Sequence, residues 1–146
     1  MNTKMETQLN PYLSNLVVMF LKLHDLHWNV SGPLFVQVHE HTEALYDDAA
    51  EKLDAVAEKI IMAGGKPVSK MAGYLELATI KEAENLSYSV DDVLKELLKD
   101  YKTLKAQACA IRKDMDAEGE FSVVMLLEDQ IASYEKEIWF LEAMTK

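Results

Sequence analysis

Five side chains between residues 27 and 58 are of types that bind transition-metal ions. They are two imidazoles and three carboxylates, namely His27, His39, Glu43, Asp54 and Glu58. Neutral imidazole and carboxylate oxygen are ligands that suit iron(II). Glu43 follows His39 by four residues, and Glu58 follows Asp54 by four. Each pair therefore lies on one face of a helix, and the sequence predicts a metal site that uses both pairs.

The two pairs cannot meet within one chain if they share a helix, because the helical rise from His39 to Asp54 is roughly 22 Å. A second copy of the helix, packed antiparallel across a two-fold axis, removes this difficulty. One register pairs His39 with Glu58, and the same register pairs Glu43 with Asp54. Residues 49–50, both alanine, lie near its centre and are small enough to allow a close approach. Each subunit is then expected to hold half of two shared sites.

Simpler interpretations of these residues remain open. A single histidine in line with an apolar stripe, such as His27, is usually hydrogen-bonded within a core. Carboxylates are also abundant, since the chain has 25 Asp and Glu against 15 Lys and Arg and a formal net charge of −10. A solvated acidic surface is ordinary for a soluble protein. The acidity weighs against nucleic-acid binding, which needs a basic patch, and favours cations as partners.

Two helices and a short turn must position the histidines. Apolar residues recur at alternating spacings of four and three along the first of these helices, with His27 in the same stripe. A turn at residues 31–34, Ser-Gly-Pro-Leu, then predicts a hairpin between antiparallel helices. The second helix is expected over residues 35–63, and Gly64-Gly65 directly after it provides a C-cap. His27 and His39 should therefore lie at a similar height on either side of the turn.

A long connection separates this hairpin from two further helices. The apolar pattern weakens over residues 66–87, where a short helix near 71–78 is expected. Ser89, with Asp92 three residues later, is a capping signal for a third helix that ends near Glu118-Gly119. A fourth apolar stripe runs from Val124 almost to the C-terminus. We therefore predict an all-α four-helix bundle, with a short helix in a long crossover between helices 2 and 3, as one domain over residues 1–146.

The composition also predicts where the protein works. The longest unbroken apolar run covers residues 16–21, far short of the roughly 20 residues that span a bilayer. The N-terminus lacks the pattern of a secretory signal. We therefore expect a cytoplasmic protein without a membrane segment. The single cysteine, Cys109, is expected to be a small buried residue, because its neighbours are apolar and no second cysteine exists.

Several motifs between residues 23 and 67 occur together at characteristic spacings. They are His27-Trp28 before a glycine turn, Phe35, His39-Glu40, Asp54 and Ala57-Glu58. This combination resembles the signature of the Dps family, the mini-ferritins named as DNA-binding proteins from starved cells. The chain length, the long connection and the bundle extend the resemblance across nearly the whole chain. No Glu-x-x-His motif occurs, which favours this ferritin-like family over classical ferritins.

The resemblance implies a dodecameric shell with ferroxidase sites at two-fold interfaces. His27, His39 and position 43 would come from one subunit, and Asp54 and Glu58 from its mate. The sites would oxidise iron(II), with hydrogen peroxide preferred to dioxygen, and the shell would store ferric oxide and protect against oxidative stress. The family usually has aspartate where this chain has Glu43, so an altered second iron position is expected.

Two functions from other classes stay open. One is a structural or nucleoid-associated shell with a degraded iron site. The other is a divalent-metal buffer that favours zinc, which accepts the same ligands. The DNA-binding property of the family is not expected in this chain. Lys4 is the only basic residue among the first ten, and the net charge is negative. Little or no direct DNA binding is therefore predicted.

The sequence also predicts where a few tryptophan and histidine side chains outside the ligand set lie. Trp28 resembles the family tryptophan near the iron site, but core packing is the role expected for it. Trp139 is expected to pack on the apolar side of the fourth helix. His24 and His41 are expected on helix surfaces, without a partner that the sequence identifies.

Overall fold

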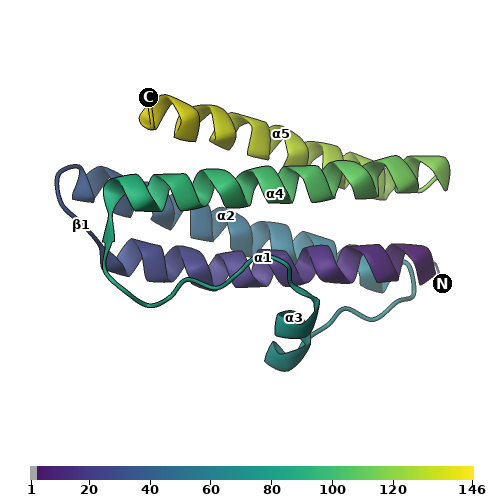
Figure 1. Cartoon of the computed structure of the whole chain (residues 1–146). Coiled ribbons are helices and arrows are strands. Elements are labelled where there is room, and N and C mark those ends of the chain that lie inside the picture. Colours follow the sequence, from purple (N-terminus) through teal and green to yellow (C-terminus); the bar gives the residue numbers. More distant parts are fainter. Residues whose placement is uncertain (1–2) are drawn as a thin grey trace.

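Residues 3–146, which the computed structural model describes, form four long helices and one short helix beside them (Figure 1). The long helices are α1 (Thr3–Asn29), α2 (Phe35–Met62), α4 (Val90–Ala117) and α5 (Phe121–Met144). The short helix α3 (Met71–Leu77) lies in the connection between α2 and α4. The predicted all-α bundle with a helix-containing crossover between its second and third long helices is confirmed.

The core lies between the apolar stripes of the long helices. Leu9, Leu16 and Leu23 line the inner face of α1, and each is at most 1% exposed. Leu97 of α4 and Leu127 of α5 are fully buried opposite them. Burial of one such side chain contributes about 1.5–3 kcal/mol, so these stripes supply the main force that holds the helices together.

Two buried asparagines of α1 bind the crossover to the bundle. The side-chain oxygen of Asn15 accepts hydrogen bonds from the backbone N–H groups of Thr79 at 2.8 Å and Ile80 at 2.9 Å. Asn10 exchanges hydrogen bonds with the backbone of residues 66–68 in a similar way. These bonds satisfy backbone groups of an irregular segment, and they fix its path along α1.

A small pair of strands joins the end of α1 to the start of α4. Strand β1 (Val30–Ser31) pairs in parallel with β2 (Tyr88–Ser89). The sequence did not predict these strands, because two residues are too few to show an alternating pattern. Ser89 then caps α4, as expected, because its side chain accepts a hydrogen bond from the backbone N–H of Asp92 at 3.1 Å.

Two residues predicted to be buried lie on the outside of the bundle. Cys109 is exposed, and Trp139 is 66% exposed. Each follows an inward-facing position, and a helix turns by about 100° per residue, so the next side chain points away from the core. The prediction of burial is wrong for both, because an apolar neighbour in sequence is not a neighbour on the same helix face.

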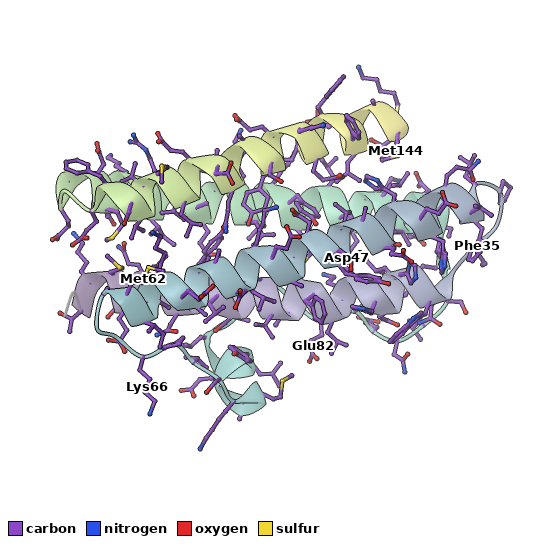
Figure 2. The ribbon with its side chains drawn as sticks, turned by 180° about the vertical axis from the view of Figure 1, so that it is seen from behind. Phe35, Asp47, Met62, Lys66, Glu82 and Met144 are labelled. Carbon is purple, nitrogen blue, oxygen red and sulfur yellow. The ribbon has the colours of Figure 1, made fainter. Side chains whose placement is uncertain are left out.

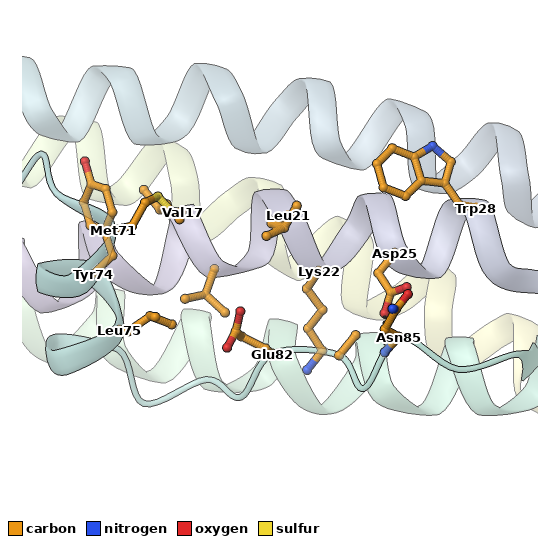
Figure 3. Close-up of a pocket in the computed structure, with 12 residues that line it drawn as sticks. Val17, Leu21, Lys22, Asp25, Trp28, Met71, Tyr74, Leu75, Glu82 and Asn85 are labelled. Atoms are coloured by element: carbon orange, nitrogen blue, oxygen red, sulfur yellow. Dashed lines mark hydrogen bonds between the residues drawn. The ribbon is translucent and has the colours of Figure 1, made fainter.

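Apolar side chains also line a groove between α1 and α3 (Figure 3). Its walls include Val17, Leu21 and Trp28 from α1 and Met71 and Leu75 from α3. Trp28 is 65% exposed, so core packing within the subunit is wrong for this residue. Despite this exposed apolar area, the helices within residues 3–146 are all too short or too polar to cross a membrane.

Candidate metal centre

A tight turn between α1 and α2 brings the two predicted histidine ligands together. Gly32 has a φ of 111° and Leu34 a φ of 69°, both in the left-handed region. Glycine adopts this region at little cost, whereas a non-glycine residue there stores about 1–3 kcal/mol of strain. The backbone N–H of Phe35 closes the turn by donating to the Gly32 carbonyl at 3.1 Å. The last turn of α1 therefore faces the first turn of α2.

His27 and His39 hold each other in place across this turn. Their rings stack with centroids 3.6 Å apart and an interplanar angle of 15°. His27 Nδ1 lies 2.6 Å from the His39 carbonyl oxygen, and His39 Nδ1 lies 3.0 Å from the His27 carbonyl oxygen. A carbonyl oxygen can only accept, so both Nδ1 atoms carry the hydrogen. The Nε2 atom of each neutral ring then carries a lone pair that can bind a metal.

The surroundings of His27 favour the neutral ring that a metal needs. The side chain is 5% exposed, and its Nδ1 also lies 3.1 Å from the hydroxyl of the fully buried Thr42. Burial lowers the pKa of His27 below its ordinary value, although the His39 carbonyl and the charge of Glu43 act in the opposite direction. At neutral pH the ring is therefore uncharged and its Nε2 is free to act as a ligand.

The three carboxylates lie on the exposed side of α2, which runs across the front of the view in Figure 2 from Phe35 to Met62. Glu43 is close enough to His27 for its charge to act on that ring. Asp54 and Glu58 project from the same helix farther along. Across residues 3–146, no three His, Cys, Asp or Glu side chains converge in a way that could hold a metal ion. One subunit therefore brings the histidines together and leaves Asp54 and Glu58 apart from them.

A cluster of aromatic rings supports the histidines from the side of α1. Tyr46 of α2 meets the His27 ring edge-on, at 5.3 Å and 89°, and stacks on the His24 ring at 3.8 Å and 20°. His24 Nδ1 donates to the Phe20 carbonyl oxygen at 2.7 Å. The sequence identified no partner for His24, and the structure provides the Phe20 carbonyl and the Tyr46 ring. Sequence reasoning missed Tyr46, although its place three residues after Glu43 puts both on one helix face.

The Tyr46 hydroxyl lies in a negatively charged environment. Desolvation and the negative charges of Glu43 and Asp47 raise the pKa of Tyr46 above its ordinary value. The phenol therefore stays protonated at neutral pH.

The structure adds two facts about α2. The sequence identified no partner for His41, and the structure places its Nε2 2.7 Å from Oε2 of the mostly buried Glu137 on α5. This hydrogen bond raises the pKa of His41 and links α2 to α5. Ala49 is 4% exposed and faces the core of its own subunit, whereas Ala50 is half-buried. Of these two alanines, only Ala50 is accessible to a second copy.

Comparisons with known proteins agree with this architecture. A model of the ferritin family, described as a ferritin-like domain, matches residues 6–146. A DNA protection during starvation protein of Helicobacter pylori is 36% identical over 87% of this chain and 88% of its own length. A crystal structure of a Dps protein from Bacillus brevis superimposes with a TM-score of 0.95 at 33% identity, covering 99% of this chain and 96% of that one.

A second solved structure extends the comparison. A Dps protein from Vibrio cholerae O1, described as a member of a broad superfamily of ferritin-like diiron-carboxylate proteins, gives a TM-score of 0.95 at 30% identity. The match covers 99% of this chain and 90% of that one. Sequence similarity over almost the full length and near-identical topology thus lead to the same assignment. The chain belongs to the Dps family of ferritin-like proteins.

Proposed function

We propose that the protein is a ferroxidase and iron-storage protein of the cytoplasm, which takes iron(II) as its substrate and retains the ferric product inside a dodecameric shell. Its sites lie between subunits, and hydrogen peroxide is the oxidant. By consuming both iron(II) and peroxide, the reaction protects the cell against oxidative stress. The proposal rests on the residues below and on the chemistry that their arrangement permits.

The reciprocal histidine pair is the observation that carries the proposal. His27 and His39 each use Nδ1 to bind the carbonyl oxygen of the other residue, which leaves both Nε2 atoms as metal ligands. Ring nitrogens bonded to carbonyl oxygens in this way are the usual support for metal-binding histidines, because the bond fixes the tautomer and the ring orientation. Two histidines with no role beyond packing would not need both rings in this state.

The remaining ligands would come from the partner subunit. Antiparallel packing of α2 against its copy brings Asp54 and Glu58 of the partner subunit to Glu43 and His39. All three carboxylates are exposed in the single subunit and available for this contact. The exposed apolar groove between α1 and α3 gives a second copy a surface to bury, since contiguous apolar patches mark interaction sites.

The proposed reaction follows from these donors. Two iron(II) ions each give one electron to a peroxide molecule, and with water they yield ferric oxyhydroxide and release protons. The chain holds the ions and their ligands in position, and the released protons pass to the solvent. Imidazole and carboxylate also suit zinc, which should therefore compete with iron for the site and inhibit oxidation.

A mixing experiment tests whether the ligands act across the two-fold axis. Subunits with His27→Ala and His39→Ala, and subunits with Asp54→Ala and Glu58→Ala, should each assemble into nearly inactive oligomers. After dissociation and random reassembly, half of the dimers are mixed, and each of these has one site with every ligand intact. Activity should return to about a quarter of that of the parent protein if sites act independently.

Tags on the two parents verify that mixing has occurred. Each unmixed variant, taken through the same dissociation and reassembly, is the control for damage during the procedure. Correctly mixed oligomers that remain as inactive as their parents would rule out the shared site, because a site within one chain gains nothing from mixing.

A further inference from the structure

Thr42 of α2 contacts the histidine pair, although it supplies no ligand to the proposed metal site. Its side chain is fully buried, and its Oγ1 lies 3.1 Å from His27 Nδ1. The same oxygen lies 2.8 Å from the Val38 carbonyl oxygen and 3.0 Å from the His39 carbonyl oxygen. The Thr42 hydroxyl therefore meets the ring nitrogen that also binds the His39 carbonyl at 2.6 Å.

The positions of the hydrogens follow from these contacts. Nδ1 of His27 carries a hydrogen, because the His39 carbonyl oxygen beside it can only accept. The Thr42 hydroxyl has one hydrogen, and the carbonyl oxygens of Val38 and His39 are its two acceptors. Whichever carbonyl takes that hydrogen, a lone pair of Thr42 Oγ1 is left for the N–H of His27. The His27 N–H is therefore shared between two acceptors, the His39 carbonyl and the Thr42 hydroxyl.

Two other helical threonines show the ordinary arrangement for comparison. The hydroxyls of Thr7 and Thr103 donate to the carbonyl four residues earlier, at 2.7 Å and 3.1 Å, and both residues are exposed. A bond of this kind is common for threonine within a helix and indicates no further role. Thr42 makes the same bond, but it is buried and also contacts a nitrogen of a proposed metal ligand. This additional contact links Thr42 to the metal site.

The second acceptor favours the form of His27 that a metal needs. A neutral imidazole binds a metal through Nε2 only while Nδ1 keeps the hydrogen. Two oxygens at Nδ1 favour this tautomer. They also oppose rotation of the ring by half a turn, because that rotation would replace the N–H with a C–H and leave both oxygens without this donor.

We propose that Thr42 is a positioning residue, whose hydroxyl fixes the tautomer and the ring orientation of His27 and so keeps Nε2 available to the metal. This inference rests on the proposed function, because it assumes that His27 binds the metal. It assigns to Thr42 a role in metal affinity rather than in redox chemistry. Loss of a supporting contact to a metal-binding histidine typically weakens metal binding by 10- to 100-fold.

Two substitutions of Thr42, with cobalt(II) as the probe, test the inference without iron oxidation. Anaerobic titrations of the assembled protein, followed by absorption of bound cobalt, give the affinities. Thr42→Val keeps the branched shape and removes the hydroxyl, so it should weaken cobalt binding by roughly 10-fold or more. Thr42→Ser keeps the hydroxyl and loses a methyl group, so it should bind cobalt nearly as tightly as the parent. If Thr42 served only to pack, Thr42→Ser would be the more damaging change, because it leaves a cavity.

The same titrations in two histidine backgrounds show which ring Thr42 supports. The effect of Thr42→Val should persist in a His39→Ala protein and disappear in a His27→Ala protein, because the contact joins Thr42 to His27 alone of the two rings. Ser14→Ala is a matched control. Ser14 is fully buried in α1, and its hydroxyl donates to the Asn10 carbonyl at 2.8 Å, away from the proposed ligands. This substitution should leave cobalt affinity unchanged.

Several results would overturn the inference. They are no loss of affinity in Thr42→Val, a greater loss in Thr42→Ser than in Thr42→Val, an equal loss from Thr42→Val in both histidine backgrounds, or the same loss from Ser14→Ala. Failure of the proposed function gives a different result. If the His27→Ala/His39→Ala variant binds cobalt as tightly as the parent, the metal site itself is wrong. If that variant loses binding while Thr42→Val behaves like the parent, the metal site stands and only the role of Thr42 is refuted.

Discussion

The two halves of the proposed metal site differ in how much of their geometry the subunit fixes by itself. At one end of α2, His27 and His39 are stacked, bonded to each other's backbone and largely shielded from solvent. Farther along the helix, Asp54 and Glu58 are exposed and make no hydrogen bond or ion pair with any other residue in 3–146. The fold thus preorganises the nitrogen ligands and leaves the oxygen ligands of the other half free.

This difference suggests a division of work. A stacked, bonded imidazole has already lost its rotational freedom on folding, so metal binding does not lose it again. Free carboxylates lose theirs only when a metal and a second subunit are both present. In the proposed assembly, the histidine half defines where the first metal ion binds, and the carboxylate half makes tight binding depend on assembly.

The largest expected effect comes from keeping the histidine half intact and removing its partner. Ala44→Arg places a long charged side chain on the exposed face of α2, where it should block antiparallel packing of two copies. A variant shown by size exclusion to be monomeric at the assay concentration should oxidise iron(II) at less than about 1% of the parent rate, since each missing carboxylate costs charge stabilisation.

Far-UV circular dichroism of the monomeric variant should match that of the parent, because position 44 is exposed. A folded, strictly monomeric protein with the native oxidation rate would show that iron oxidation does not need the carboxylates of a second subunit. The difference between the two halves of the site would then have no effect on activity.

A smaller effect should appear in the stability of the metal-free chain. In the monomeric background, His27→Ala removes a buried ring and its hydrogen bond to the His39 carbonyl, which should lower the free energy of unfolding by about 1–3 kcal/mol. Glu58→Ala should change it by no more than about 0.5 kcal/mol, because surface substitutions without partners are nearly neutral. Urea denaturation of the two variants measures both values. Equal losses would indicate that the histidine pair is not preorganised.

The sequence was sufficient to predict the four-helix bundle and the approach of His27 to His39. The stripe from Leu9 to Leu23 predicts α1, and the short turn predicts that His27 and His39 approach, since both follow from local periodicity and turn chemistry. The sites of Asp54 and Glu58 stay a prediction, because their partners belong to another copy.

The support around the histidines was not predictable in the same way. The stacking of Tyr46 on His24 joins α2 to α1. Periodicity predicts the helix face on which each ring lies, but it does not predict which rings of two different helices come into contact. The exposure of Trp28 and Trp139 depends likewise on how far the helices rotate about their axes when they pack. The β1–β2 pair needs contacts between residues nearly sixty positions apart, which no local pattern records.

His27 of α1 and His41 of α2 should affect stability with opposite dependences on pH. His27 has a lowered pKa, so its contribution to stability is present above its unfolded value of 6.5 and is lost as the pH falls through the folded value. His41 has a raised pKa, mainly from its hydrogen bond with Glu137, so its contribution is present below 6.5 and is lost as the pH rises through the folded value.

Variants of these histidines separate the two effects. In metal-free monomers, the destabilisation by His41→Ala should be larger at pH 5 than at pH 8, and that by His27→Ala larger at pH 8 than at pH 5. The opposite signs of the two trends follow from the opposite directions of the two pKa shifts. The same trend in both variants would contradict the assigned environments.

The smallest expected effect concerns DNA, where the prediction is no binding. Each chain carries a formal charge of −10, and the exposed carboxylates of α2 add to a surface that repels phosphate. Specific or non-specific binding to duplex DNA depends on displacing counterions with lysine and arginine, and neither the acidic balance nor the free carboxylate half supplies that. The assembled protein should therefore not retard duplex DNA in metal-free buffer at physiological salt. Divalent cations can bridge carboxylates to phosphates, so any retardation that appears on their addition should vanish with chelator. Tight retardation that persists in chelator would instead favour the nucleoid-associated shell over the iron-storage function, and it would require a basic surface that a single subunit does not display.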